Sequence, residues 1–212
     1  MRYYPVFLDI ASKPVVVIGG GQVSLRKVEG LLDAGAKITI VSPELHPKLR
    51  RLADEGQLHY EQREYRPGDL EGYTLAFVVS DDRSVNAAVA REGRERGIWV
   101  NAVDDPPSCD FVMPSVVRRG DFIVAISTSG GSPAMARKLR EEIEAFLTED
   151  HVLLLELATE VCRELRAKGV QVDSEVWNAA LDRELRDLLT RGLRAEAKER
   201  LLRFLLQPAR KA

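Results

Sequence analysis

Apolar runs and helical stretches alternate along the first half of the chain. Five compact runs predict strands, at residues 14–19, 36–42, 58–65, 73–80 and 98–103. Three stretches with helical spacing lie between them, at residues 23–35, 45–56 and 83–97. Strands separated by helices predict an α/β domain with a parallel sheet and helices on both faces. The near-continuous apolar strands agree, because such a sheet is buried on both sides.

The pattern changes after residue 110. The runs FVMPSVV and DFIVAIST are joined by RRGD, which is too short for a helical crossover, so they predict a hairpin. A helix is expected from Pro133 to about residue 148, followed by a tail that is entirely helical. We therefore predict a nucleotide-binding domain at 1–112, a strand–strand–helix module at 113–148 and a helical domain at 149–212.

The tail carries three apolar stripes at helical spacing. They are Leu154, Ala158, Val161 and Leu165, then Trp177, Leu181, Leu185 and Leu188, then Ala197, Leu201 and Leu205. These stripes, and Trp99 in the last predicted strand of the sheet, are interpreted as core.

Composition narrows the class of protein. The chain has 212 residues, 45% hydrophobic and 30% charged, which is enough to bury a sizeable core. Its formal net charge of −2 gives no global sign of nucleic-acid binding. Cys109 and Cys162 form no CxxC pair, no apolar run approaches a membrane span, and the start of the chain lacks the apolar core of a signal peptide. We expect a cytoplasmic protein without a histidine-based metal site, because the three histidines are scattered.

A glycine loop follows the first strand. The sequence Gly19-Gly20-Gly21-Gln22-Val23-Ser24 matches G-x-G-x-x-(G/A) with serine in the last position. In a Rossmann-like fold the first glycine allows the strand-to-helix turn, and the second lets the backbone approach a pyrophosphate at the helix N-terminus. The position of the loop inside a βαβ unit favours a dinucleotide site, and the alternative is a purely structural turn.

The second strand ends in the sequence Ser42-Pro43-Glu44. An acidic residue near this point often binds the ribose hydroxyls, so Ser42 or Glu44 could do so. No arginine stands at the strand end, which favours NAD over NADP, although Lys48, Arg50 and Arg51 lie downstream. Ser42 could instead only cap the next helix.

Polar residues follow the fourth and fifth strands. Ser80 and Asp81 belong to the same carboxyl edge of the sheet, where Asp81 or Asp82 could simply cap the next helix. Asn101 near the end of the fifth strand, and Asp104 and Asp105 after it, belong to this edge too, but Pro106 and Pro107 prevent an immediate helix there. A carboxylate held by this turn could accept a proton beside a bound nicotinamide, or it could only form an Asx-type turn.

These motifs together resemble the precorrin-2 dehydrogenase (sirohydrochlorin ferrochelatase) family, which includes the N-terminal part of siroheme synthase. The resemblance rests on GGGxVxxRK, VNxVDxP, FxxPS and ISTSGxSPAxAxxLR and covers residues 3 to about 145. Because no methyltransferase domain follows, the chain looks like the stand-alone form. The resemblance implies an NAD-binding fold, a homodimer formed through the middle module, and oxidation of precorrin-2 to sirohydrochlorin.

The resemblance also implies roles for individual residues. The acid of VNxVD is Asp104, the expected general base. The cofactor contacts are expected at Gly19, Gly20, Gly21, Gln22, Val23, Ser42, Pro43, Glu44, Ser80 and Asp81. The substrate-binding residues are expected to be Asn101, Arg118, Arg119, Ser127, Thr128, Ser129 and Arg137. The basic residues suit a substrate with eight carboxylates, and the alternative for them is a solvated helix face.

Two alternatives to a plain dehydrogenase stay open. Some family members also insert Fe²⁺ into sirohydrochlorin, and the same carboxylate could serve both reactions. A non-catalytic NAD-sensing domain would need no base, so the paired acids and the STSGGSP loop argue against it. Thr128 stands where some relatives carry a phosphorylated serine.

Overall fold

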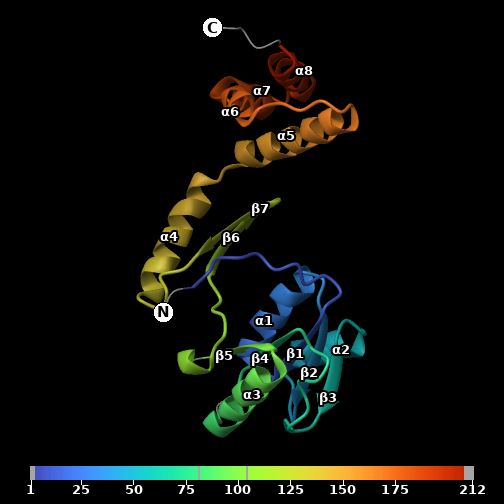
Figure 1. Ribbon diagram of the computed structural model, residues 1–212, viewed down its shortest axis with the longest axis vertical. Helices are drawn as coiled ribbons and strands as arrows, with labels where there is room; N and C mark the ends of the chain where they lie inside the picture. Colours follow the sequence, from blue (N-terminus) through green and yellow to red (C-terminus); the bar gives the residue numbers. More distant parts are fainter. Residues whose placement is uncertain (1–2, 81, 104, 208–212) are drawn as a thin grey trace. The chain divides into compact units, whose positions relative to one another are not determined.

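The computed structural model describes residues 3–80, 82–103 and 105–207, which fall into two compact units, Met1–Met113 and Pro114–Ala212 (Figure 1). The first unit contains a five-stranded sheet in the order β3-β2-β1-β4-β5, and all of its neighbouring strands are parallel. The strands are β1 Pro14–Ile18, β2 Lys37–Ser42, β3 His59–Gln62, β4 Leu75–Val78 and β5 Trp99–Ala102. The predicted parallel α/β sheet is confirmed.

Alternate residues of the central strands point to opposite faces of the sheet. Val15 and Val17 of β1 join one core, to which α1 (Gln22–Asp33) and α2 (Pro47–Asp54) contribute. Val16 and Ile18 join the other core, which α3 (Arg83–Arg96) completes. All four of these residues are at most 3% exposed. Burial on both faces explains why β1 is a continuous apolar run.

The edge strands depart from expectation. The predicted strand at 58–65 is a strand only over His59–Gln62, and none of these four residues is buried. Trp99 was expected in the core, but 52% of its surface is exposed, so that prediction is wrong. Trp99 is the first residue of β5, and β5 pairs within the sheet only with β4. A position at the end of an edge strand does not require burial, however apolar its side chain.

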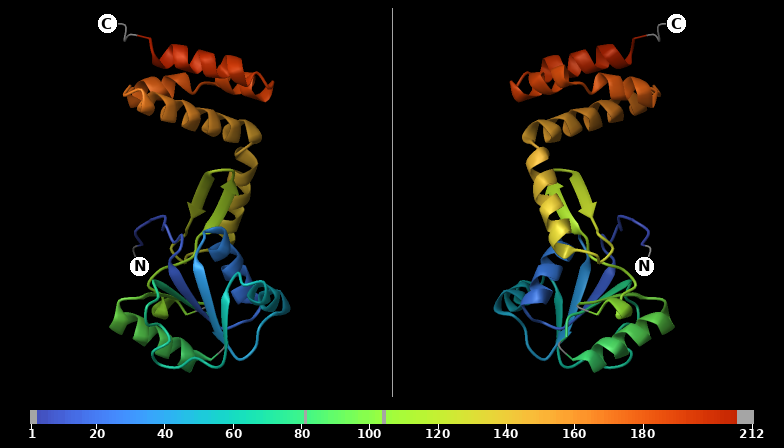
Figure 2. Two further views of the ribbon diagram at one scale, coloured as in Figure 1. Left: turned by 90° about the vertical axis from the view of Figure 1, so that its right-hand side faces the viewer. Right: turned by 90° about the vertical axis from the view of Figure 1, so that its left-hand side faces the viewer.

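The second unit begins with a hairpin. β6 (Ser115–Arg119) pairs antiparallel with β7 (Phe122–Ile126), in a register that sets Arg118 opposite Ile123, as the short connection predicts. The helix α4 (Pro133–Phe146) packs mainly against β6 (Figure 2). Ser132 caps α4 by accepting a hydrogen bond from the Met135 N–H at 3.2 Å.

The rest of the second unit is helical. The helices are α5 Glu149–Ala167, α6 Ser174–Ala180, α7 Arg183–Thr190 and α8 Arg194–Leu205. They share one core, in which the predicted stripe residues Val161, Leu185 and Leu201 are fully buried. Hydrophobic spacing alone therefore located the core of this bundle correctly.

The residues with assigned structure contain no helix that is long and apolar enough to cross a membrane. Among the same residues no group of histidine, cysteine, aspartate and glutamate side chains could hold a metal ion. The division of the second unit at residue 148 stays a prediction.

Candidate functional site

The glycine loop lies between β1 and α1, at the carboxyl edge of the sheet. Gly19 has φ +110°, and a Cβ there would come within 2.1 Å of the Val79 carbonyl oxygen. Its N–H donates to the Val41 carbonyl at 2.9 Å, so the loop is tied to β2. Only glycine fits this position, because both the backbone angle and the space exclude a side chain.

The next two glycines have different surroundings: Gly20 is closely packed, and Gly21 faces open space. A Cβ on Gly20 would come within 2.2 Å of the Glu44 carbonyl, and the Gly20 carbonyl itself accepts the His46 N–H at 2.7 Å. A Cβ on Gly21 would meet no atom within 4 Å. Gly21 is also the N-cap of α1, and no side chain in the described part of the chain caps that helix. The first turn of α1 is thus free to receive an anion, and these residues fit the pyrophosphate of a dinucleotide.

Ser24 occupies the last position of the glycine motif, in α1. It is fully buried, and its hydroxyl has no hydrogen-bond partner among the described residues. A buried hydroxyl without a partner costs about 1–3 kcal/mol. The structure confirms close packing at this position, and explains why glycine or alanine is the usual residue.

The loop after β2 is held by its own polar groups. The Ser42 hydroxyl donates to the Glu44 carbonyl at 2.7 Å, and Ser42 is only 6% exposed. Tyr60 donates to the Ser42 carbonyl at 2.9 Å. His46, not Ser42, caps α2, because its Nδ1 accepts the Lys48 N–H. Ser42 therefore shapes the loop, and the exposed Glu44 side chain is left as the group that can face a ribose.

The segment after β4 is held by α3. Asp82 caps α3, and the bonds from the Ser84 hydroxyl and N–H lower the pKa of its carboxyl. Asn86 is 4% exposed and donates from its side chain to the Ser80 carbonyl at 3.2 Å. Ser80 therefore lies where predicted, at the carboxyl edge. Asp81 lies outside the described residues.

The stretch that follows β5 folds back along the open edge of that strand. Asp110 accepts the Val100 N–H at 2.8 Å through its carboxylate, and its own N–H donates to the Val100 carbonyl at 2.8 Å. The Cys109 thiol accepts the Ala102 N–H at 3.2 Å and donates to the Ala102 carbonyl at 3.0 Å. Two side chains and the Asp110 backbone N–H thus supply the partners that a further strand would have given β5.

This returning segment, which closes the open edge of β5, also explains the positions of two of the predicted polar residues. Asn101 is 6% exposed and donates to the Phe111 carbonyl at 2.9 Å, so its amide holds the returning chain. The Asp105 carbonyl accepts the Ser108 N–H at 3.0 Å and starts the short 3₁₀ turn Pro106–Ser108, as expected for a turn residue. Asp104 lies outside the described residues.

Cys109 is a packed thiol. Burial raises its pKa, and the nearby Asp105 and Asp110 carboxylates act in the same direction, while the bond from the Ala102 N–H opposes them. Such a thiol is a poor nucleophile at neutral pH. Cys109 therefore serves to hold the backbone rather than to react.

The STSGGSP loop precedes α4 in the second unit. The Thr128 hydroxyl accepts the Ser132 N–H and donates to the Ser132 carbonyl, both at 3.1 Å. The Ser127 hydroxyl accepts the Ser129 N–H at 3.1 Å, and Ser129 has φ +52°. Thr128 and Ser127 thus fix the loop, and Ser129 occupies the left-handed region that non-glycine residues rarely adopt.

The predicted arginines are placed on the hairpin and on α4. Arg118 and Arg119 are the last two residues of β6, so their side chains leave opposite faces of the hairpin. Arg118 and Arg137 are exposed, and Arg119 is half-buried. Among described residues none of the three meets a carboxylate, which leaves all three charges available to an acidic ligand.

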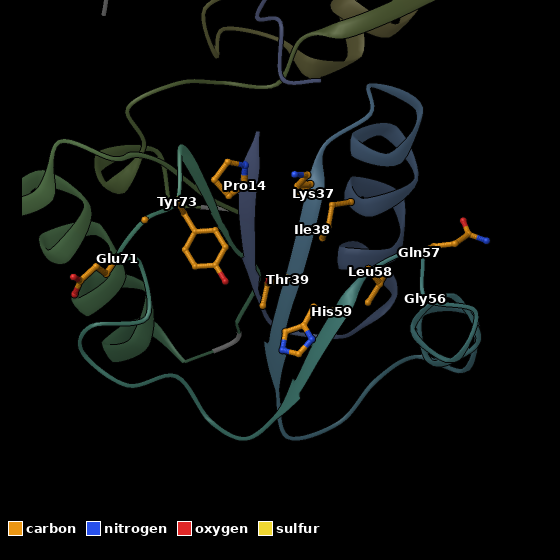
Figure 3. Close-up of a pocket in the computed structure, with 11 residues that line it drawn as sticks. Pro14, Lys37, Ile38, Thr39, Gly56, Gln57, Leu58, His59, Glu71 and Tyr73 are labelled. Carbon is orange, nitrogen blue, oxygen red and sulfur yellow. The ribbon is translucent and has the colours of Figure 1, made fainter. Parts of the chain in front are cut away.

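A separate hollow of about 450 Å³ lies in the first unit (Figure 3). Its lining includes Pro14, Lys37 and His59, the first residues of β1, β2 and β3. It therefore opens at the amino ends of these strands, whereas the glycine loop follows the carboxyl end of β1. This hollow is not part of the dinucleotide site, which parallel sheets place beyond the carboxyl ends of their strands.

Sequence reasoning missed the residues that hold the site rather than form it. Asn86, Cys109 and Asp110 bond to backbone groups of the segments that follow β4 and β5. One signal was available: β5 is a largely buried edge strand, and no further strand follows it in the sheet. Its outer backbone groups must therefore find partners in the segment that follows.

Comparison with known proteins adds to this geometry. A family model described as putative NAD(P)-binding matches residues 6–115, more than half of the chain. A second, described as the central part of a sirohaem biosynthesis protein, matches residues 119–145. The chain belongs to the siroheme-biosynthesis family of NAD(P)-binding proteins. The resemblance predicted from the motifs is thereby confirmed.

Members of the siroheme-biosynthesis family match along nearly all of this chain. Siroheme synthase of Methylococcus capsulatus is 37% identical over 204 residues, 95% of this chain and 43% of the relative. Siroheme synthase 1 of Aeromonas salmonicida is 38% identical over 202 residues, 94% of this chain and 43% of the relative. The chain thus spans less than half the length of these curated relatives.

A solved structure of the same family supports the fold. "SirC, precorrin-2 dehydrogenase" is 25% identical, with a TM-score of 0.75 over 95% of this chain and 100% of that chain. The family model that contains the glycine loop is described as NAD(P)-binding, and this structural match agrees with the Rossmann-like fold.

Proposed function

We propose that the protein oxidises precorrin-2 to sirohydrochlorin with NAD⁺. The observation that carries the proposal is the uncapped start of α1 beside Gly21, which lies open at the carboxyl edge of the sheet. The segment after β5, with Asp104 and Asp105, leaves the same edge. The family supplies the substrate class: one relative is named a siroheme synthase and another a precorrin-2 dehydrogenase.

The chemistry requires one base. Dehydrogenation removes a hydride and a proton from precorrin-2, and bound NAD⁺ supplies the hydride acceptor. We assign the proton to Asp104, which comes directly before Asp105 and its 3₁₀ turn in the sequence. The overall reaction converts precorrin-2 and NAD⁺ into sirohydrochlorin, NADH and a proton, so no further oxidant is needed.

We assign the contacts with cofactor and substrate to the residues whose positions are described above. We assign the pyrophosphate to Gly19–Val23 and the ribose to Glu44, with Ser42 and Pro43 shaping that loop and Ser80 and Asp81 at the next strand end. For the acidic substrate we assign the charges of Arg118, Arg119 and Arg137 and the loop of Ser127, Thr128 and Ser129. Asn101 was also expected to bind substrate, and we assign it the role of holding the chain that returns after β5.

The test is an anaerobic assay of the purified protein with precorrin-2 and either NAD⁺ or NADP⁺. We expect NADH absorbance to rise together with the sirohydrochlorin spectrum, and the reaction to be faster with NAD⁺. Binding of NAD⁺ without either spectral change would point instead to an NAD-sensing domain.

A second activity is favoured by the name of the relatives, since siroheme contains iron. We propose that the same site also accepts Fe²⁺ as substrate and inserts it into sirohydrochlorin, with Asp104 taking pyrrole N–H protons. Anaerobic Fe²⁺ and sirohydrochlorin should form siroheme faster with the protein than without it. Equal rates would exclude this activity.

We also propose a homodimer formed through residues 113–148, in the cytoplasm. The support is a set of apolar side chains exposed on the hairpin and α4: Ile123 at 40%, Met135 at 55%, Leu139 at 36% and Phe146 at 69%. Exposed apolar surface on this scale favours an interface. Light scattering should give twice the mass of one chain. The double variant Leu139→Asp with Met135→Asp should lower the measured mass to that of one chain.

A further inference from the structure

A groove of about 910 Å³ opens in the helical part of the second unit, lined by residues of α5, the following loop and α6. This volume is within the range of small-molecule sites. The groove lies apart in the chain from the glycine loop and from every residue assigned above to cofactor or substrate.

The floor of the groove is apolar. Leu165 is 3% exposed, and Val172 and Trp177 pack against the core of the helical bundle while also lining the groove. Trp177 is half-buried, so part of its ring system faces the opening. A half-buried indole offers a flat apolar surface to a ligand.

Two arginines of α5 stand at the rim. Arg163 and Arg166 are three residues apart, which places them on one side of the helix about a turn from each other. Both are exposed, and neither meets a carboxylate among the described residues. Two like charges at this spacing repel each other slightly, and a bound anion would remove that cost.

On another side of α5, by contrast, the charged side chains are paired. Glu160 accepts from Arg194 at 2.6 Å and from Lys198 at 2.8 Å, and Glu164 pairs with Lys168 at 2.7 Å. The charges toward α8 are thus neutralised within the protein. Those at the groove are not.

We propose that this groove binds a flat aromatic molecule that carries two or more carboxylates. The ring would lie on Trp177 and the apolar floor, and the carboxylates would pair with Arg163 and Arg166. Arginine suits this role because its planar fork matches a carboxylate with two hydrogen bonds. The proposal goes beyond the dehydrogenase activity and does not rest on it.

The probe is naphthalene-1,4,5,8-tetracarboxylate, tested on the full chain. Cys162 lines the groove, so in a Cys109→Ser variant the remaining thiol reports on occupancy. We expect saturable binding by calorimetry and slower alkylation of Cys162 with the same concentration dependence. Citrate has carboxylates but no ring. At equal concentration it should neither bind saturably nor slow the alkylation of Cys162.

Matched variants locate the site. Arg163→Ala with Arg166→Ala should weaken probe binding by roughly tenfold or more, because two charge-assisted contacts are lost. Arg183→Ala with Arg191→Ala removes the same charge from two exposed residues at the ends of α7 and should change binding less than about twofold. Circular dichroism checks that each variant folds.

Unchanged alkylation of Cys162 at saturating probe would overturn the proposal, because the probe would then bind elsewhere. Equal weakening by the two double variants, or equal protection by citrate, would also overturn it, since either shows unspecific anion binding. Displacement of the probe by NAD⁺ would assign it to the glycine loop instead.

Discussion

Gly19 and Gly21 are both glycines for physical reasons, but the reasons differ. At Gly19 the backbone angle and the Val79 carbonyl exclude a side chain, whereas at Gly21 the space for a Cβ is empty. The first glycine therefore belongs to the fold, and the second keeps space for a ligand.

A matched pair of substitutions tests this difference. Gly19→Ala should lower the free energy of unfolding by at least about 2 kcal/mol through strain and a backbone clash. Gly21→Ala should change it by less than about 1 kcal/mol, yet raise the Kd for NAD⁺ roughly tenfold, because the methyl group occupies the approach of the pyrophosphate. Chemical denaturation and calorimetry measure the two quantities. Unchanged NAD⁺ affinity in Gly21→Ala would place the cofactor elsewhere.

Asp104 carries the proposed proton transfer. Asp104→Asn should cut the turnover of precorrin-2 by roughly 10²–10⁴-fold and leave the Kd for NAD⁺ nearly unchanged, because the amide cannot accept the proton. Asp105→Asn is the control, since the described contact of Asp105 with Ser108 uses its backbone carbonyl. Full turnover in Asp104→Asn would remove this residue from the mechanism.

At the scale of elements, the closure of β5 links a strand edge to the site. The thiol of Cys109 bonds to both backbone groups of Ala102, shortly before Asp105, which starts the 3₁₀ turn. The sequence indicated a rigid exit from its two prolines, but it gave no sign that side chains would replace a sixth strand. A thiol accepting and donating across a strand edge has no periodic signature.

Substitution of Cys109 tests the closure. Cys109→Val keeps the apolar volume but loses both hydrogen bonds, so the free energy of unfolding should fall by about 1–3 kcal/mol. Cys109→Ser keeps a donor and an acceptor and should cost less. Amide exchange at Ala102 should quicken in Cys109→Val, and unchanged exchange there would show that the thiol does not hold the strand.

A buried carboxylate ties α3 to the loop before β4. Glu92 is 7% exposed and accepts from Tyr65 at 2.6 Å, from the Gly68 N–H at 3.0 Å and from the Leu70 N–H at 3.2 Å. Burial opposes its ionisation, but these bonds and the charge of Arg96 outweigh burial and lower its pKa below 4.5. Burial and the bond to Glu92 raise the pKa of the Tyr65 hydroxyl.

The ionisation of Glu92 makes the free energy of unfolding depend on pH. Because the pKa of Glu92 is lower in the folded state, its contribution is complete above the ordinary pKa of 4.5 and is lost as the pH falls through the folded value. Glu92→Gln should lower the free energy of unfolding at pH 7 by about 1–3 kcal/mol and flatten its dependence on acid. An equally steep acid dependence in the variant would contradict this.

At the scale of the whole molecule, the sequence predicted the order of elements better than their ends. The apolar strands of the sheet and the stripes of the tail were read correctly, because burial on two faces or on one stripe leaves a periodic pattern. Trp99 was misread because apolar character alone does not distinguish a central strand from an edge. The helical groove had no sequence signature, since Leu165 and Trp177 of its floor belong to the same stripes as the core.

The site was predictable where it rests on backbone geometry and unpredictable where it rests on side-chain bonding. The glycine motif placed the tight turn between β1 and α1, because only glycine fits the backbone at Gly19. Ser42 was expected to face the ribose or cap α2, but its hydroxyl is bonded to the Glu44 carbonyl. Such a local bond depends on the folded path of the loop.

The most direct test of the central claim is the anaerobic oxidation of precorrin-2 by the purified protein with NAD⁺, followed by absorbance. NADH and sirohydrochlorin should appear in equal amounts, at a rate proportional to protein concentration and abolished when NAD⁺ is omitted. Tight NAD⁺ binding with no formation of sirohydrochlorin above the protein-free rate would contradict the proposed dehydrogenase activity.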